Sequence, residues 1–134
     1  FSKNSIFFLK EKKKLFEIKN SKIKINSKNN KQELGVDGLL LNHKTSLRLK
    51  NNIENKTNIV FEIPKLDISI NILLKNNDNF QTFEGKVNLV VLNNFLQFNL
   101  IKKKFFVLNQ GFIRNNLINS SFKGEVFFKP HLFF

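Results

Sequence analysis

The chain has 134 residues and a formal net charge of +13, from 23 Lys and Arg against 10 Asp and Glu. The absence of Cys excludes a disulfide scaffold, a Cys-ligated metal site and a thiol nucleophile. Hydrophobic residues make up 41% of the chain, which excludes a disordered tail, and the length is that of one domain.

Apolar and polar residues alternate along most of the chain, which predicts β-strands with one apolar and one polar face. The alternation is clearest where Ile68, Ile70 and Ile72 are separated by polar residues. Residues 1–14 are ambiguous between a strand and a charged loop. In chain order, we predict strands at 15–19, 22–27, 34–41, 46–50, 58–63, 65–74, 83–92, 95–101, 104–108, 112–114, 121–128 and 131–134.

Short Asn-rich segments separate the predicted strands, and Asn suits tight turns because it tolerates a positive φ. We expect a two-residue hairpin turn at Asn93-Asn94 and another turn at 42–44. All connections are short and no linker is seen, so residues 1–134 are predicted to form a single β-rich segment. This segment is an all-β antiparallel meander that builds a long curved sheet or groove. Since the chain begins at Phe1 and contains no Met, we expect it to be an internal fragment of a longer protein.

Gly38, Gly85 and Gly124 share one local pattern: apolar residue, charged residue, Gly, any residue, apolar residue. Gly at such positions permits a bulge or a close approach of two backbones. The pattern is consistent with a repeat-like sheet, although three Gly residues can also precede strands by chance.

The sequence contains no recognisable catalytic or metal-binding constellation, and it predicts no enzyme activity and no cofactor. The two histidines, His43 and His131, have no Asp, Glu or His at a ligand spacing. Glu62 and Asp67 lie close together in the sequence, but both fall on the predicted polar face and not in a cleft that would raise their pKa.

The positive charge is carried almost entirely by Lys, with Arg48 and Arg114 the exceptions. A chain rich in Lys, Asn, Ile and Phe is typical of an A/T-rich genome, and the scarcity of Arg weakens the argument for nucleic-acid binding. The Lys runs at 12–14 and 102–104 either bind phosphate or lipid head groups, or form solvated turns that protect sheet edges.

All 17 aromatic residues are Phe, and several are adjacent, as in Phe7-Phe8 and Phe105-Phe106. Neighbouring residues of a strand point to opposite faces, so each pair places a ring on both faces of the sheet. We therefore expect an open apolar surface, which usually marks a binding site.

The segments at 83–89 (FEGKVNL) and 122–134 (FKGEVFFKPHLFF) resemble the AsmA-like family over about residues 34–134. The resemblance rests on the Gly-led strand, the Asn-rich turn, and an apolar strand containing Lys-Pro. It implies a long β-sheet curled into an apolar groove, located in the periplasm. It also implies anchoring in the inner membrane by a region outside this fragment, and a role in phospholipid transfer or outer-membrane assembly.

On this interpretation the apolar faces of stacked strands join into one trough that holds acyl chains. Ordinary core packing of the same residues is the alternative. A second functional hypothesis is a basic β-domain that binds RNA or DNA, and a third is a segment of a transmembrane β-barrel, which the absence of Tyr and Trp disfavours. The predicted groove-lining residues are Phe61, Ile63, Ile68, Ile70, Ile72, Val87, Leu89 and Phe98.

Overall fold

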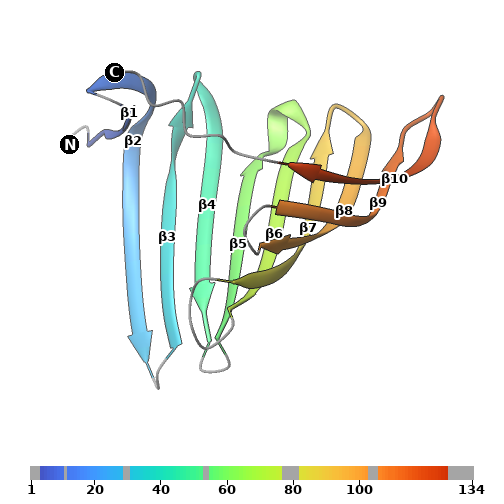
Figure 1. Ribbon diagram of the computed structural model, residues 1–134. Helices are drawn as coiled ribbons and strands as arrows, with labels where there is room; N and C mark the ends of the chain where they lie inside the picture. The colour runs from blue at the N-terminus through green and yellow to red at the C-terminus, as the bar shows by residue number, and fades with distance from the viewer. Residues whose placement is uncertain are drawn as a thin grey trace, which may run out of the picture.

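The computed structural model describes residues 4–10, 12–28, 31–52, 55–76, 82–102 and 106–126. Ten strands form one antiparallel sheet in which each strand pairs with its neighbours in the sequence, and the sheet is not closed into a barrel (Figure 1). The prediction of an all-β antiparallel meander is confirmed. The strands are β1 (Ile6–Lys10), β2 (Lys13–Lys28), β3 (Lys31–Leu40), β4 (His43–Asn51), β5 (Lys56–Ile63), β6 (Ile68–Asn76), β7 (Phe83–Val91), β8 (Asn94–Lys102), β9 (Phe106–Arg114) and β10 (Asn119–Val126).

The sheet twists strongly from its first strands to its last. Strands β2, β3 and β4 run side by side in nearly one direction, whereas β8, β9 and β10 run across that direction (Figure 1). Steric interactions of L-residues give every strand a right-handed twist, and the rotation accumulates over neighbouring strands. Ten strands in a single sheet therefore curve instead of lying flat.

Two pairs of predicted strands are continuous strands that contain a bulge. The segments predicted at 15–19 and 22–27 form the single strand β2, whose pairing with β3 shifts between Lys19 and Lys22. The segment predicted at 112–114 and the described part of the one predicted at 104–108, residues 106–108, both belong to β9, whose pairing with β8 shifts between Gln97 and Asn99. A residue with positive φ lies at each bulge: Asn20 at 50° and Gln110 at 49°. An extra residue breaks the period of two, which is why the sequence predicted strand ends there.

The tight turns lie one residue earlier than predicted. The β7–β8 hairpin turns at Leu92-Asn93, and Val91 pairs with Asn94. The β3–β4 hairpin turns at Leu41-Asn42, so that His43 already belongs to β4. All four turn residues have positive φ, between 48° and 65°, as a type I′ turn requires.

Pro64 begins a short 3₁₀ turn, η1 (Pro64–Leu66), between β5 and β6. Strand β6 therefore begins at Ile68 and not at residue 65 as predicted. Asp67 ends η1 in a left-handed conformation, with φ 49°, and its backbone N–H donates to the Pro64 carbonyl. The missing N–H of Pro64 costs no ladder hydrogen bond in this turn.

Two of the three patterned Gly residues lie where backbones approach closely. A Cβ at Gly38 would lie 2.4 Å from Cγ2 of Ile18, and one at Gly85 would lie 2.8 Å from the Leu73 carbonyl oxygen. A Cβ at Gly124 would meet nothing within 4 Å. Close approach explains the first two. Gly124 instead lies where the pairing of β10 with β9 shifts, between Phe122 and Gly124, which agrees with the alternative explanation by a bulge.

The N-terminal segment, which the sequence left open between a strand and a charged loop, contains strand β1. This strand pairs with the first part of β2. The predicted strand at 131–134, the end of the strand predicted at 121–128, and His131 lie outside the described residues.

Side-chain burial is concentrated on one face of the sheet. Ile18, Val36, Ile63 and Val87 are the buried hydrophobic residues among those described, with exposed fractions between 2% and 8%. The register places all four on the same face. The core is thus the layer of side chains on this face.

Candidate functional site

The register aligns apolar side chains into rows that cross the sheet on this face, which we call the apolar face. Paired residues of neighbouring strands lie on the same side of a sheet, so the ladder defines each row. One row runs from β3 to β9 and consists of Val36, Leu47, Phe61, Ile70, Leu89, Leu96 and Ile113. The row beside it runs from β3 to β8 and consists of Leu34, Leu49, Ile59, Ile72, Val87 and Phe98.

The eight residues predicted to line a groove lie together on the apolar face. Three belong to the first row and three to the second. Ile63 and Ile68 pair with each other in the next row toward η1. The eight form one continuous patch over β5, β6, β7 and β8, as the alternation predicted.

Sequence reasoning missed how far the rows extend beyond this patch. Val36 and Leu47 continue the first row to β3, and Leu96 and Ile113 continue it to β9. The seven strands from β3 to β9 span six strand spacings, about 29 Å. Only the cross-strand register reveals this length, because no local pattern states which strands are neighbours.

The apolar face is only partly covered. All strands of the described residues belong to one sheet, so none of them forms a second layer over this face. Leu47, Phe61, Ile70 and Leu89 are half-buried. At the β2 end of the face, Ile25 is 79% exposed. Neighbouring side chains on the curved sheet bury one another in part, and the remaining apolar surface is open.

Aromatic rings lie at both ends of the apolar face. Phe8 stacks on Phe16, with centroids 4.1 Å apart, and Phe98 lies 6.2 Å from Phe122. The Phe122 ring occupies the space above Gly111, where a Cβ would lie 2.4 Å from the ring. Phe7 projects to the opposite face and is 54% exposed, which agrees with the expectation that a Phe pair places one ring on each side.

The opposite side of the sheet, which we call the polar face, carries most of the charge. Arg48 pairs with Asp37 at 2.5 Å, and Lys50 pairs with Glu33 at 3.0 Å. Arg48 also donates to two backbone carbonyls, those of Val36 and Leu47, at 3.1 Å each. Glu62 accepts a hydrogen bond from the Ser46 hydroxyl at 3.4 Å, on the polar side as predicted.

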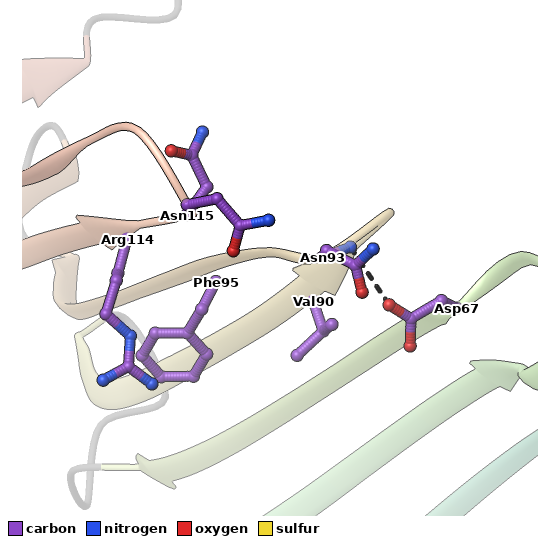
Figure 2. A pocket seen from close by; sticks show the side chains of 7 residues that line it. Asp67, Val90, Asn93, Phe95, Arg114 and Asn115 are labelled. Carbon is purple, nitrogen blue, oxygen red and sulfur yellow. Dashed lines mark hydrogen bonds between the residues drawn. The ribbon is translucent and has the colours of Figure 1, made fainter.

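A pocket of about 580 Å³ lies at the turn end of β7, β8 and β9 (Figure 2). Val90 and Phe95 are its apolar lining, and Asp67 and Arg114 are its charged groups. Its remaining residues are Asn93, Asn115 and Asn116.

Most polar groups of this pocket are engaged in holding the turns. The carboxylate of Asp67 accepts from the Asn93 N–H at 3.0 Å (Figure 2). The Asn115 side-chain oxygen accepts from the N–H groups of Leu117 and Ile118, and its Nδ2 donates to Asn94. These hydrogen bonds hold the turns that border the pocket.

The described residues also hold no group of three or more His, Asp and Glu side chains that could bind a metal ion. His43 stands at the end of the apolar face, and its buried Nδ1 has no hydrogen-bond partner. The helical turn η1 has three residues, and no helix in the described ranges has the length and apolar character needed to cross a membrane.

Comparison of the chain with family models, with curated proteins and with solved structures finds no match.

Proposed function

We propose that this chain is a non-enzymatic, lipid-binding segment of a β-groove protein, and that acyl chains lie on its apolar face. One observation carries the proposal: two adjacent rows of apolar side chains cross six or seven strands without a charged residue. A protein core needs a second layer, and the described residues supply none. Acyl chains would supply it, at about 0.8 kcal/mol for each buried methylene.

The resemblance to the AsmA-like family extends this proposal to a place and a process. The segment would work in the periplasm, within a longer protein that is anchored in the inner membrane outside this fragment. It would support phospholipid transfer or outer-membrane assembly. The length of the first row agrees with this role, since about 29 Å exceeds the roughly 15 Å of one leaflet's hydrocarbon.

The test compares two adjacent residues of β6 that point to opposite faces. Ile72 lies on the apolar face, and Leu73, which is 48% exposed, lies on the polar face. The probe is hexadecanol, which displaces the neutral dye N-phenyl-1-naphthylamine from the delipidated chain. We expect Ile72→Gln to weaken hexadecanol binding about tenfold, because a polar group replaces a contact worth about 1.5 kcal/mol. We expect Leu73→Gln to change it less than twofold.

Circular dichroism establishes that both variants keep the sheet. Absence of hexadecanol binding by the unmodified chain, or equal losses in the two variants, would refute the proposal. A stable dimer in gel filtration that excludes the dye would also refute it, because a second copy would then be the occupant. Phospholipid that co-purifies with the chain and is identified by mass spectrometry would support it.

The position of the basic residues favours a second candidate function, in which the polar face binds RNA or DNA. Lys22 and Lys24 lie on this face of β2, where Lys22 is the cross-strand partner of Asp37 and Lys24 that of Gly35. Nucleic-acid binding predicts retention of a single-stranded oligonucleotide at low salt and a steep loss as salt rises. No retention at low salt would remove this candidate.

A further inference from the structure

A lysine stands at one end of the apolar face. Lys102, the last residue of β8, pairs with Phe83 of β7 and with Phe106 of β9. The ladder therefore places it on the apolar face, two residues beyond Leu100. From β3 to β9, it is the only Lys, Arg, Asp or Glu that the register of the described residues puts on this face.

The ammonium of Lys102 lies between two aromatic rings. Nζ is 5.7 Å from the Phe83 centroid and 6.0 Å from the Phe106 centroid, and the two rings are 6.0 Å apart. Cation–π contacts hold a charge in place but leave its N–H donors available to an anion.

No carboxylate of the described residues forms an ion pair with Lys102. The nearest candidates in the ladder, Glu84 and Glu125, pair with Ile101 and Val107 and so lie on the polar face. An anion that reaches Lys102 from the apolar side therefore meets no competing acid. Apolar surroundings also strengthen the attraction between opposite charges compared with open water.

We propose that Lys102 binds the anionic head group of a lipid whose chain lies on the apolar face. This proposal rests on the lipid-binding function proposed above. The head group is a carboxylate or a phosphate, both of which Lys binds as a point charge. From Lys102, the apolar positions Leu100, Phe98 and Leu96 follow along β8, over about 20 Å. An acyl chain can follow this line or turn into the rows that cross the sheet.

The experiment compares three probes on the delipidated chain: palmitate, hexadecanol and acetate. Palmitate and hexadecanol share the chain length and differ in charge, whereas acetate has the charge without the chain. Each is titrated against bound N-phenyl-1-naphthylamine below its aggregation concentration. We expect palmitate to bind about tenfold more tightly than hexadecanol, the ratio typical of one hydrogen-bonded charge pair. We expect acetate not to displace the dye.

The matched variants are Lys102→Met and Lys86→Met. Lys86 pairs with Leu73 and Asn99 and lies on the polar face of the adjacent strand. Lys102→Met should lower the palmitate affinity and bring the ratio of palmitate to hexadecanol affinity close to one. Lys86→Met should keep the tenfold ratio.

The outcomes separate the two proposals. Equal binding of palmitate and hexadecanol by the unmodified chain overturns the assignment of Lys102 and leaves the lipid-binding function standing. Loss of the preference in Lys86→Met as much as in Lys102→Met also overturns it, because general attraction to a basic protein would then explain the ratio. Failure of both long-chain probes to bind refutes the lipid-binding function itself.

Discussion

The two faces of this sheet are built from the same strands and differ in what stabilises them. On the apolar face, Ile63 is only 4% exposed, and neighbouring rows of aliphatic residues bury one another. On the polar face, the pairs Asp37–Arg48 and Glu33–Lys50 remain partly exposed. Burial of one large aliphatic side chain contributes about 1.5–3 kcal/mol, whereas an exposed ion pair contributes about 0–1 kcal/mol. Stability should therefore depend on the apolar face, and solubility on the polar one.

The contrast weakens toward the C-terminal strands. On the polar face of β8 and β9, Phe95 and Phe112 lie with their ring centroids 6.5 Å apart, and Ile101 pairs with Val107. The described ion pairs all lie in the N-terminal half of the chain. The polar face thus carries one apolar side chain in each of the middle strands β5, β6 and β7 (Val60, Leu73 and Val90) and two in each of β8 and β9.

The largest expected difference between the faces comes from two residues of β5. Ile63→Ala removes a buried side chain from the apolar face and should lower the free energy of unfolding by about 2–5 kcal/mol. Val60→Ala, at a half-buried position on the polar face, should lower it by less than about 1.5 kcal/mol. Urea denaturation followed by circular dichroism measures both values. Equal losses would mean that the polar face also contributes a core.

Two glycine positions, Gly38 and Gly124, differ in how closely a neighbouring strand approaches the backbone. Gly38→Ala would place a Cβ 2.4 Å from Cγ2 of Ile18 and 2.9 Å from the Lys19 carbonyl oxygen, and the backbone atom cannot move aside easily. We expect a loss of about 1–3 kcal/mol in the same denaturation experiment. Gly124→Ala meets open space and should be neutral or stabilise by up to about 1 kcal/mol. A neutral Gly38→Ala would contradict the close approach of β2 and β3.

The faces could be predicted from the sequence while the register could not, and the β7–β8 hairpin explains why. Moving a two-residue turn by one position shifts every cross-strand partner by two residues, which leaves each side chain on its own face. A turn at Asn93-Asn94 would place Val87 opposite Leu100, whereas the observed turn places it opposite Phe98. Both pairs are apolar, so the local pattern does not distinguish them.

A contact from outside the hairpin accompanies the observed register. The backbone of Asp67 accepts from the Leu92 N–H at 3.1 Å, and its carboxylate accepts from the Asn93 N–H at 3.0 Å. Asp67 comes from the connection between β5 and β6, so the sequence of the hairpin alone does not contain this information. The bulges in β2 and β9 are a related case, because an extra residue interrupts the alternation that predicts a strand.

For the apolar face, too, some features follow from the local sequence pattern and others only from strand pairing. The eight residues predicted to line a groove share one face because each belongs to an alternating strand. In the sequence, Lys102 belongs to the basic run at 102–104, which predicts either a solvated turn or a segment that binds phosphate or lipid head groups. Its position between Phe83 and Phe106 depends on two strand pairings. No pattern within the run indicates them.

A smaller effect is expected from the ion pair of the polar face. The side chains of Arg48 and Asp37 are 34% and 37% exposed, so solvent screens their attraction. A double-mutant cycle with Arg48→Met and Asp37→Asn should give a coupling of about 0.2–1 kcal/mol, which decreases as salt is added. A coupling above about 2 kcal/mol would show that the polar face contributes more than its exposure predicts.

The smallest expected effect concerns the N-terminal hairpin, where Glu17 forms an ion pair with Lys14. The hydrogen bond from Lys14, followed by that from Ser5, lowers the pKa of Glu17 below its ordinary value of 4.5. A carboxyl group with a lowered pKa in the folded state stabilises the fold above its unfolded-state pKa, and this contribution is lost as the pH falls through the lowered value.

Titration of the Glu17 carboxyl by NMR should give a midpoint below 4.5 in the unmodified chain, and Lys14→Met should raise it. Because the Lys14 side chain is 49% exposed and solvent screens its attraction to Glu17, the same substitution should leave the urea midpoint nearly unchanged, in contrast to Ile63→Ala. A Glu17 midpoint that does not move in Lys14→Met would instead attribute the lowered pKa to Ser5.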